Sequence, residues 1–423
     1  MFHEGIAFTR REFLYSGMAM ISTATSAPAF LARSGLAMAD QNMAHGLDRS
    51  GSVPEQVLVV VQLSGGNDGL NTVIPVGSPG YYRARPRIAI AEKDALLIDP
   101  NQGIALHPAL ADLHEMVSEG LASVVQGVGY PNPNRSHFAS MDVWHTGDTR
   151  GGRGHGWIGK GLDQDRNIDR SLACVCIGSD APLAAQGRHV KPVAFERAEA
   201  FRWAGRQRQS ELASVYDRIC REGGDSDMDA ATRFVYRTAL DAQVASDRVR
   251  KAVATGPVTR FAGGALSRQL QLVAAMIRAE LPTRVYYVAL GGFDTHAQQV
   301  FTHQRLLREF ASAMKTFYRE LEATGHRSRV VTLAFSEFGR RVAQNASAGT
   351  DHGAAGPVFL FGDVVRPGLQ GEHPPLDQLV GGDLRFGLDF RCIYAELLDN
   401  WLQLDSTAAL GRVFRKTRLL DLS

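Results

Sequence analysis

Acidic and imidazole side chains follow three apolar runs rich in β-branched residues, at the point where each run ends. The residues concerned are Asp68 after 57–63, Asp294 and His296 after 284–290, and Glu337 after 329–335, with His352 ahead of a further run at 357–361. Such runs predict strands that are buried on both faces of a parallel sheet. Because the carboxyl ends of parallel strands share one edge of a sheet, we expect these side chains to meet there.

Several carboxylates in one small site raise one another's pKa unless a cation lies among them. Carboxylates together with two imidazoles suit zinc, manganese or iron. The sequence therefore predicts a divalent metal site made of Asp68, Asp294, His296, Glu337 and His352. Zinc fits this set best, manganese, iron and calcium are alternatives, and one or two ions are equally compatible with it. For Asp68 alone a strand-ending turn is an equal alternative, since Asn-Asp-Gly is common turn chemistry.

A hydroxyl and two guanidinium groups complete the predicted site. Ser136 follows the apolar run 122–128 and opens a stretch with helical spacing, for which Asn134 is the predicted cap. A serine at a helix N-terminus lies in positive potential, which favours an ionised oxygen; the alternative is that Ser136 only caps the helix. Arg135 and Arg340 are candidates to bind phosphoryl or sulfuryl oxygens, with a surface ion pair as the alternative role of each.

Helical spacing alternates with these apolar runs along most of the chain. Helices are expected at 108–119, 265–281 and 300–323, and this order predicts an α/β fold. The charged, amphipathic segment 196–262 is expected to be a helical insertion with a solvated surface. We therefore expect one domain over 55–423, preceded by a polar spacer at 40–54.

Residues 1–39 have the pattern of an export signal. Thr9-Arg10-Arg11 precedes a mildly apolar run of small residues, and Ala37-Met38-Ala39 is a cleavage site. The run is too short and too rich in small polar residues for a membrane anchor, and no later run is long enough to span a membrane. A twin-arginine signal predicts a periplasmic or extracellular protein with no membrane span after signal removal.

Composition excludes one class of partner. The 46 Lys and Arg nearly balance the 44 Asp and Glu, so the basic excess expected of a nucleic-acid-binding protein is missing. Four cysteines are present: Cys174, Cys176, Cys220 and Cys392. No second pair follows Cys174 and Cys176 at zinc-ligand spacing, so buried free thiols are expected, with one disulfide left open because the periplasm is oxidising.

Five motifs in order carry a family resemblance. They are Leu63-Ser64-Gly65-Gly66-Asn67-Asp68-Gly69, Asn134-Arg135-Ser136-His137-Phe138, Gly292-Phe293-Asp294-Thr295-His296, Glu337-Phe338-Gly339-Arg340 and Asp351-His352-Gly353. With the twin-arginine start, they resemble the exported bacterial family known as domain of unknown function 1501, within the alkaline phosphatase/sulfatase superfamily. The resemblance implies an alkaline phosphatase-like three-layer fold, a central and largely parallel sheet flanked by helices. It also implies the metal set given above, with Ser136 as nucleophile.

The chain departs from the superfamily pattern in three places. Phosphatases have an Asp-His pair where this chain has Glu337-Phe338. Their first-metal Asp and His are separated by three residues, whereas Asp294 and His296 are separated by one. One metal, or an unusual pair, is therefore as compatible with the sequence as two zinc ions. Pro131 occupies the place of the oxidisable nucleophile of sulfatases, which excludes formylglycine chemistry there.

These patterns predict an exported, metal-dependent hydrolase of phosphate or related esters such as sulfates or phosphonates. The nucleophile would be a Ser hydroxyl or a metal-bound water, and the substrate a small molecule or an ester of an envelope polymer. The alternative is a non-catalytic exported binding or assembly protein that keeps a phosphatase-like fold and has a protein partner. A dinucleotide enzyme is excluded because Asp68 would repel a pyrophosphate. A serine α/β-hydrolase is excluded because the chain has no G-x-S-x-G motif.

Overall fold

The computed structural model describes residues 55–150, 154–166, 168–197 and 245–422. The predicted signal at 1–39, the spacer at 40–54 and most of the predicted insertion at 196–262 lie outside these ranges. The chain divides into two compact units, and nearly all described residues belong to the unit made of Gly46–Glu196 and Arg248–Ser423. The sheet, the helices that cover it and the candidate site all lie in that unit.

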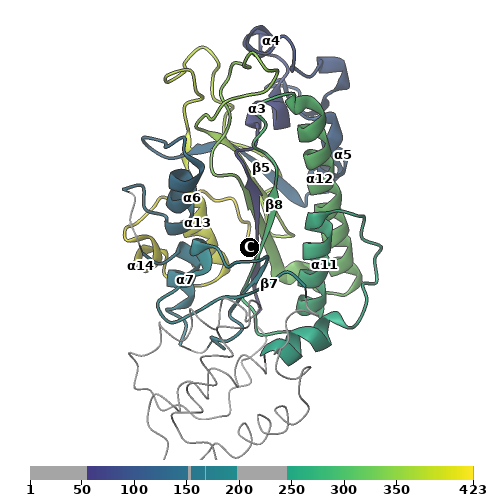
Figure 1. Cartoon of the computed structure of the whole chain (residues 1–423), viewed down its shortest axis with the longest axis vertical. Helices are drawn as coiled ribbons and strands as arrows, with labels where there is room; N and C mark the ends of the chain where they lie inside the picture. The colour runs from purple at the N-terminus through teal and green to yellow at the C-terminus, as the bar shows by residue number, and fades with distance from the viewer. Residues whose placement is uncertain (1–54, 151–153, 167, 198–244, 423) are drawn as a thin grey trace, which may run out of the picture. The chain divides into compact units, whose positions relative to one another are not determined.

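A mixed sheet forms the centre of this unit (Figure 1). Nine strands belong to it within the described ranges, in the order β11-β5-β10-β9-β1-β8-β6-β7, with β12 beside β5. Their bounds are β1 Val57–Ser64, β5 Ala122–Gly129, β6 Cys174–Ile177, β7 Val193–Phe195, β8 Val285–Gly291, β9 Val330–Phe335, β10 Gly356–Phe361, β11 Gly368–Gln370 and β12 Leu388–Asp389. Of these, β10 runs antiparallel to both neighbours, and the other pairings are parallel.

Helices cover both faces of the sheet, with α5, α11 and α12 on one face and α6, α7, α13 and α14 on the other (Figure 1). Their bounds are α5 Ala111–Ser118, α6 His137–Thr146, α7 Trp157–Leu162, α11 Ala265–Arg278, α12 Gln299–Ala323, α13 Phe390–Glu396 and α14 Ser406–Leu410, with a π-helical turn at Leu397–Trp401. Both faces of β1 are buried because helices cover both, which explains its continuous apolar run. The predicted α/β fold with a largely parallel sheet flanked by helices is confirmed.

Short elements lie between the larger ones. A three-stranded antiparallel sheet pairs β4 with β2 and β3. Its strands, the remaining helices and the 3-10 turns are β2 Val73–Pro75, β3 Leu96–Asp99, β4 Ile104–Leu106, α3 Gly69–Thr72, α4 Pro79–Ala84, η1 Glu92–Asp94, η2 Pro108–Leu110, η3 Leu183–Ala185 and η4 Arg327–Arg329. None of the described helices is long and apolar enough to cross a membrane.

Aromatic packing fixes the position of α6. The Trp144 ring stacks between Phe390, at 4.2 Å between ring centroids, and Phe335, at 4.9 Å. The Tyr394 hydroxyl donates to the Trp144 carbonyl at 3.0 Å. Since Trp144 lies two turns into α6, this packing also fixes the N-terminus of the helix, where Ser136 and His137 are. The N-cap is Ser136 and not the predicted Asn134, because the Asn134 side chain instead accepts the Ser136 N–H at 2.8 Å.

The described cysteines Cys174, Cys176 and Cys392 are buried free thiols, as predicted, and Cys220 lies outside the described ranges. Burial is the main cause that raises the pKa of the Cys176 thiol. The thiolate is the reactive form of cysteine, so Cys176 is unsuited to act as a nucleophile at neutral pH.

Burial of a histidine in this core makes stability depend on pH. His145 on α6 lies 3.3 Å from Gln62 Oε1, and burial lowers its pKa from 6.5 to about 4. Below about pH 6.5, His145 binds a proton in the unfolded chain but stays unprotonated in the folded chain. The free energy of unfolding therefore decreases as the pH falls toward 4. At about pH 5 this histidine costs roughly 2 kcal/mol of unfolding free energy.

We therefore expect His145→Gln to shrink the loss of stability between about pH 7.5 and about pH 5 by roughly 2 kcal/mol. Urea unfolding of both proteins at the two pH values measures this difference. Equal losses in the variant and the parent chain would contradict the assignment.

Candidate metal centre

One edge of the sheet collects the side chains of the centre. Strands β1, β8 and β9 are parallel neighbours, with Ser64 opposite Gly291 and Gln62 opposite Phe335, so their carboxyl ends coincide. β5 runs parallel to β9, because both are antiparallel to β10. The antiparallel β10 begins where the others end, which brings the preceding segment 351–353 to the same edge. The shared edge expected from the sequence is confirmed.

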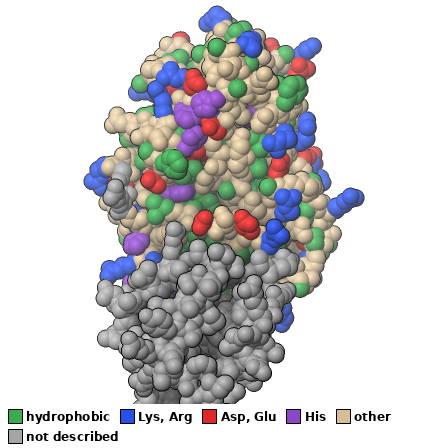
Figure 2. Space-filling model, viewed as in Figure 1, with side chains coloured by type: hydrophobic (Ala, Val, Ile, Leu, Met, Phe, Trp, Pro, Cys, Tyr) green, Lys and Arg blue, Asp and Glu red, His purple; other side chains and the backbone are tan. Residues whose placement is uncertain are grey.

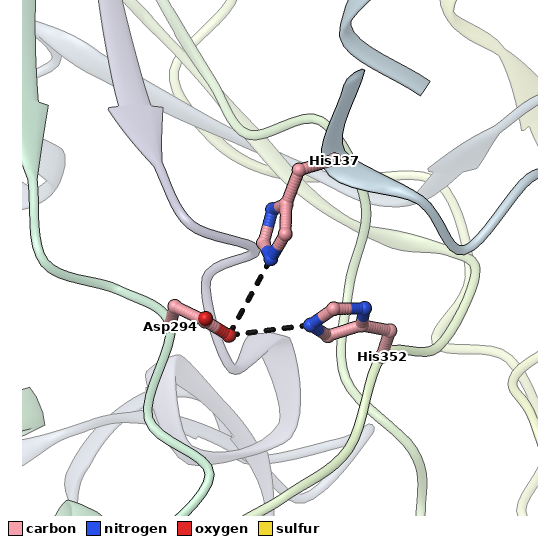
Figure 3. Close-up of side chains that lie close together, drawn as sticks. All are labelled: His137, Asp294 and His352. Atoms are coloured by element: carbon pink, nitrogen blue, oxygen red, sulfur yellow. Dashed lines mark hydrogen bonds and ion pairs between the residues drawn. The ribbon is translucent and has the colours of Figure 1, made fainter. Parts of the chain in front are cut away.

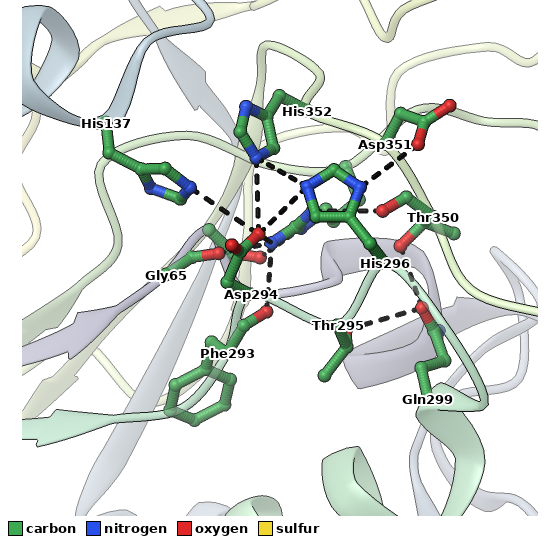
Figure 4. A network of polar contacts seen from close by, with 12 residues as sticks. Gly65, His137, Phe293, Asp294, Thr295, His296, Gln299, Thr350, Asp351 and His352 are labelled. Atoms are coloured by element: carbon green, nitrogen blue, oxygen red, sulfur yellow. Dashed lines mark hydrogen bonds and ion pairs between the residues drawn. The ribbon is translucent and has the colours of Figure 1, made fainter.

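Three imidazoles surround one carboxylate oxygen at this edge. Asp294 Oδ1 lies 3.0 Å from His296 Nε2, 3.2 Å from His352 Nε2 and 3.5 Å from His137 Nε2 (Figures 3 and 4). The ligand atoms of His137, Asp294 and His352 lie within 4.8 Å of one another, the separation expected around one metal ion. His296 adds a third imidazole, 2.8 Å from His352 Nε2. Asp294 and His296 are 48% and 44% exposed, so the centre is open to solvent.

The other nitrogen of each ring is held by an acceptor. His137 Nδ1 lies 2.8 Å from Glu337 Oε1, and His296 Nδ1 lies 3.1 Å from Asp351 Oδ1. His352 Nδ1 lies 2.7 Å from the carbonyl oxygen of Arg135. With the hydrogen of each ring on Nδ1, each Nε2 would be free to direct a lone pair to a cation beside Asp294. Metal-ligating histidines are typically oriented by this kind of outer contact.

One of the three Nε2 atoms has no hydrogen-bond partner among the described residues. His137 Nε2 is buried and makes no hydrogen bond within the described part of the chain, and a buried nitrogen without a partner is costly. A divalent ion among the three Nε2 atoms and Asp294 would satisfy all of them. Nitrogen ligands with one carboxylate suit zinc, manganese or iron. The residues present thus fit one divalent ion and define the protein as an α/β protein with a candidate histidine-rich metal centre.

Arg340 holds Asp294 in position from the protein interior. Its guanidinium is fully buried and donates to Asp294 Oδ1 at 2.7 Å. Partial burial opposes ionisation of Asp294, but bonds from Arg340 and His352 outweigh it and lower the pKa of Asp294 to about 2. Asp294 is therefore ionised throughout the physiological range. The predicted role of Arg340 as a clamp for substrate oxygens does not fit this burial, because its donors are used within the protein.

Glu337 lies behind the centre and faces His137. It is 1% exposed, and its Oε1 accepts from the Gly65 N–H at 2.9 Å as well as facing His137 Nδ1. The Ser336 hydroxyl donates to Glu337 Oε2 at 3.1 Å. Glu337 was predicted to bind the metal directly. In the structure it instead contacts His137 Nδ1, a position from which it orients the His137 ring.

Asp68 is not brought to the centre. It is fully buried, with Oδ2 2.6 Å from Arg85 Nη1 and 2.5 Å from Gln299 Nε2, and its Oδ1 caps α3. Burial raises the pKa of Asp68, but the Arg85 charge and hydrogen bond outweigh this and the net shift is downward. Both carboxylate oxygens are therefore engaged in a buried ion pair. The turn alternative for Asp68 agrees better with this geometry than the ligand role.

Two predicted site residues lie at the rim. Ser136 is exposed, and its hydroxyl makes no hydrogen bond to any described residue. Its neighbours both contact the centre, through the Arg135 carbonyl on His352 and the His137 ring. The Arg135 side chain forms the ion pair that was its alternative role, with Nε 2.9 Å from Asp383 Oδ2.

His137 was missed as a ligand, although it is a residue of the Asn134–Phe138 motif. Its position directly after a strand-ending loop at the same sheet edge was the available signal. Its spacing with Met141 and Trp144 pointed instead to an ordinary helix face. What singles out His137 is its contact with Glu337, which is 200 residues away in the sequence.

Comparison with protein-family models identifies the family of the chain. The model described as protein of unknown function (DUF1501) matches residues 55–380, and the chain belongs to this family. A comparison with curated proteins found no match.

Solved structures that resemble it include the lipoteichoic acid synthase LtaP from Listeria monocytogenes, with 11% identity, TM-score 0.33, and coverage of 85% of this chain and 81% of that one. An alkaline phosphatase superfamily protein from Vibrio parahaemolyticus has 7% identity, TM-score 0.35, and coverage of 90% and 77%. The PsFucS1 sulfatase from Pseudoalteromonas sp. has 9% identity, TM-score 0.35, and coverage of 85% and 68%. Similarities this weak carry no argument about activity, which has to come from the site.

Replacement of Asp68 should separate fold from metal binding. Asp68→Asn leaves the buried Arg85 guanidinium without its counter-charge, so we expect a loss of about 3 to 5 kcal/mol in unfolding free energy. Metal stoichiometry of the folded variant should be unchanged. Asp294→Asn is the matched comparison and should lose the metal. Denaturant unfolding and metal analysis of both variants measure this, and loss of metal from folded Asp68→Asn would return Asp68 to the ligand set.

Replacement of Glu337 should weaken metal binding without abolishing the fold. In Glu337→Gln the His137 ring loses the carboxylate that holds its Nδ1–H, and we expect metal affinity to fall by about 10 to 100-fold. Competition with a chelator of known affinity measures it. Glu372→Gln, at an exposed position outside the centre, is the control. Equal affinity in Glu337→Gln and the parent chain would contradict the orienting role.

Proposed function

We propose that this protein is an exported, metal-dependent hydrolase of phosphate or related esters, such as sulfates or phosphonates. The single observation that carries the proposal is the convergence of three imidazole Nε2 atoms on Asp294, with every Nδ1 held by an acceptor. A divalent ion bound there would polarise an ester oxygen and lower the pKa of a hydroxyl or water. Zinc fits the donor set best, and manganese, iron or calcium are alternatives.

Different residues would bind the cation and orient its ligands. Asp294, His137, His296 and His352 would hold the cation, and Glu337 and Asp351 keep two of these rings in the required tautomer. Arg340 keeps Asp294 ionised at the centre of the cluster. Because the ligand side chains are partly exposed, an ester bound to a large molecule can approach them without opening of the fold.

Two nucleophiles are compatible with the site. Ser136 lies between two residues that contact the centre, so its hydroxyl is close in sequence to the ligands. No described residue accepts its proton, however, and a serine normally needs an adjacent base. Water is therefore the simpler nucleophile, and Ser136 is the alternative that mutation can test.

Export places the substrate outside the cytoplasm in this proposal. The twin-arginine pattern at Arg10-Arg11 supports a periplasmic or extracellular location. A small-molecule ester or an ester of an envelope polymer is then the expected substrate. The rival proposal is a binding or assembly protein that keeps the metal but turns nothing over.

Metal analysis combined with an ester panel tests the proposal. We expect the folded protein to hold one divalent ion per chain and to hydrolyse at least one class among nitrophenyl phosphates, phosphodiesters and sulfates. Asp294→Asn and His352→Ala should lose both metal and turnover. Ser136→Ala should retain activity if water attacks and lose it if the hydroxyl attacks, with Ser179→Ala as the exposed control.

Bound metal without turnover of any ester would favour the binding protein. Absence of bound metal in the folded protein would contradict both the centre and the enzyme. Retained metal in His352→Ala would contradict the proposed ligand set.

A further inference from the structure

Two arginines meet at one buried carboxylate beside the metal centre. Arg135 places Nε 2.9 Å and Nη2 2.5 Å from Asp383 Oδ2, and Arg341 Nε lies 3.9 Å from Asp383 Oδ1. The Asp383 side chain is 3% exposed, whereas those of Arg135 and Arg341 are 42% and 36% exposed. A buried carboxylate thus anchors two guanidinium groups that remain open to solvent.

The backbone of each arginine is tied to a segment that carries the centre. The Arg135 carbonyl accepts from His352 Nδ1 at 2.7 Å, and the Arg341 N–H donates to the Asp351 carbonyl at 3.0 Å. Arg341 directly follows Arg340, which holds Asp294. Both guanidinium groups therefore extend from positions next to the metal-binding residues. On the face in Figure 2, basic side chains lie near surface histidine and acidic side chains.

The turn that carries Asp383 is shaped to hold these side chains. Val380 and Asp383 close the turn through backbone bonds of 3.0 and 3.2 Å, with Gly381 and Gly382 between them at positive φ. A Cβ on Gly382 would lie 3.0 Å from Arg341 Nη1, and one on Gly381 would lie 3.7 Å from Arg135 Nη2. Glycine thus permits the left-handed backbone of this turn, and at Gly382 it also leaves room for the Arg341 guanidinium.

Arg341 makes two long contacts with the turn, from Nε to Asp383 Oδ1 at 3.9 Å and from Nη1 to the Gly381 carbonyl at 3.3 Å. Asp383 Oδ1 is buried and makes no hydrogen bond within the described ranges, even though Arg341 Nε is its near neighbour. One carboxylate also faces two guanidinium charges, so the group of three keeps a positive charge. A planar guanidinium that is exposed and incompletely paired is suited to bind an anion.

We propose that Arg135 and Arg341 form a second, anion-binding subsite beside the metal centre. This inference rests on the proposed function and names its substrate class: esters whose alcohol part carries an additional anionic group. The ester would bind at the Asp294 cluster while the second anion binds the arginine pair. Anionic envelope polymers and small bis-anionic esters share this chemistry.

The charges around the centre make this binding depend on the metal. Asp294, Asp351, Glu337 and Asp383 outnumber the guanidinium groups of Arg135, Arg340 and Arg341 by one, so the wider metal-free site has a net negative charge that opposes anion binding at the arginine pair. A divalent ion reverses the balance. Anion binding is therefore expected in the metal-loaded protein and not in the protein stripped of metal.

A matched pair of non-hydrolysable phosphonates tests the subsite independently of turnover. 3-Phosphonopropionate and propylphosphonate differ by one carboxylate, and titration calorimetry with metal-loaded protein gives the Kd of each. We expect 3-phosphonopropionate to bind the parent chain about tenfold more tightly than propylphosphonate. In Arg341→Gln the two phosphonates should bind equally, with the affinity for propylphosphonate unchanged. Arg341→Lys should restore part of the preference, and Arg319→Gln, distant on α12, should keep all of it.

Equal binding of the two phosphonates by the parent chain would overturn the subsite and leave the hydrolase proposal standing. A preference retained in folded Arg341→Gln would overturn it as well. Absence of binding by either phosphonate to metal-loaded protein would contradict the subsite. Turnover of nitrophenyl esters by the parent chain, measured separately, then decides whether the hydrolase proposal stands.

Discussion

The buried guanidinium of Arg340 is the interaction on which the site depends. It donates to the Gly65 and Gly66 carbonyls after β1, to the Phe293 carbonyl and Asp294 after β8, and to the Thr350 carbonyl ahead of β10. A fully buried charge is tolerable only when its donors are satisfied, so these loops have one arrangement available to them. Gly65 contributes to this closeness, because a Cβ there would lie 2.4 Å from the Asp294 nitrogen.

Around Arg340, hydrogen-bond acceptors surround the imidazole rings, and the rings surround Asp294. Three acceptors from separate segments, Glu337, Asp351 and the Arg135 carbonyl, each orient one imidazole, and the rings then face the single carboxylate of Asp294. A second buried network lies below. Gln299 joins Asp68 to the Thr350 hydroxyl, at 2.5 and 2.8 Å, and so links the Asp68–Arg85 ion pair to the loop that carries His352. Asp68 therefore serves the centre as support.

Much of the fold and part of the site were predictable from the sequence. The apolar runs identified β1, β8, β9 and β10 within a residue or so, since strands buried on both faces admit little else. Asp294, His296 and His352 were predicted and do meet, because loops at one sheet edge have little freedom in where they go. The sequence did not predict His137 as a ligand and suggested Asp68, which the structure does not bring to the centre. The role of each depends on a tertiary contact, with Glu337 for His137 and with Arg85 for Asp68.

The sequence by itself determined the α/β order, the family and the gathering of acids and histidines at the ends of the strands, all of which follow from local patterns along the chain. Which of those side chains faces the opening, which faces inwards and which supports another was decided only by the tertiary structure. Residue type states what a group can bind. A carboxylate becomes a ligand or one half of a buried ion pair according to the charge that packing places beside it.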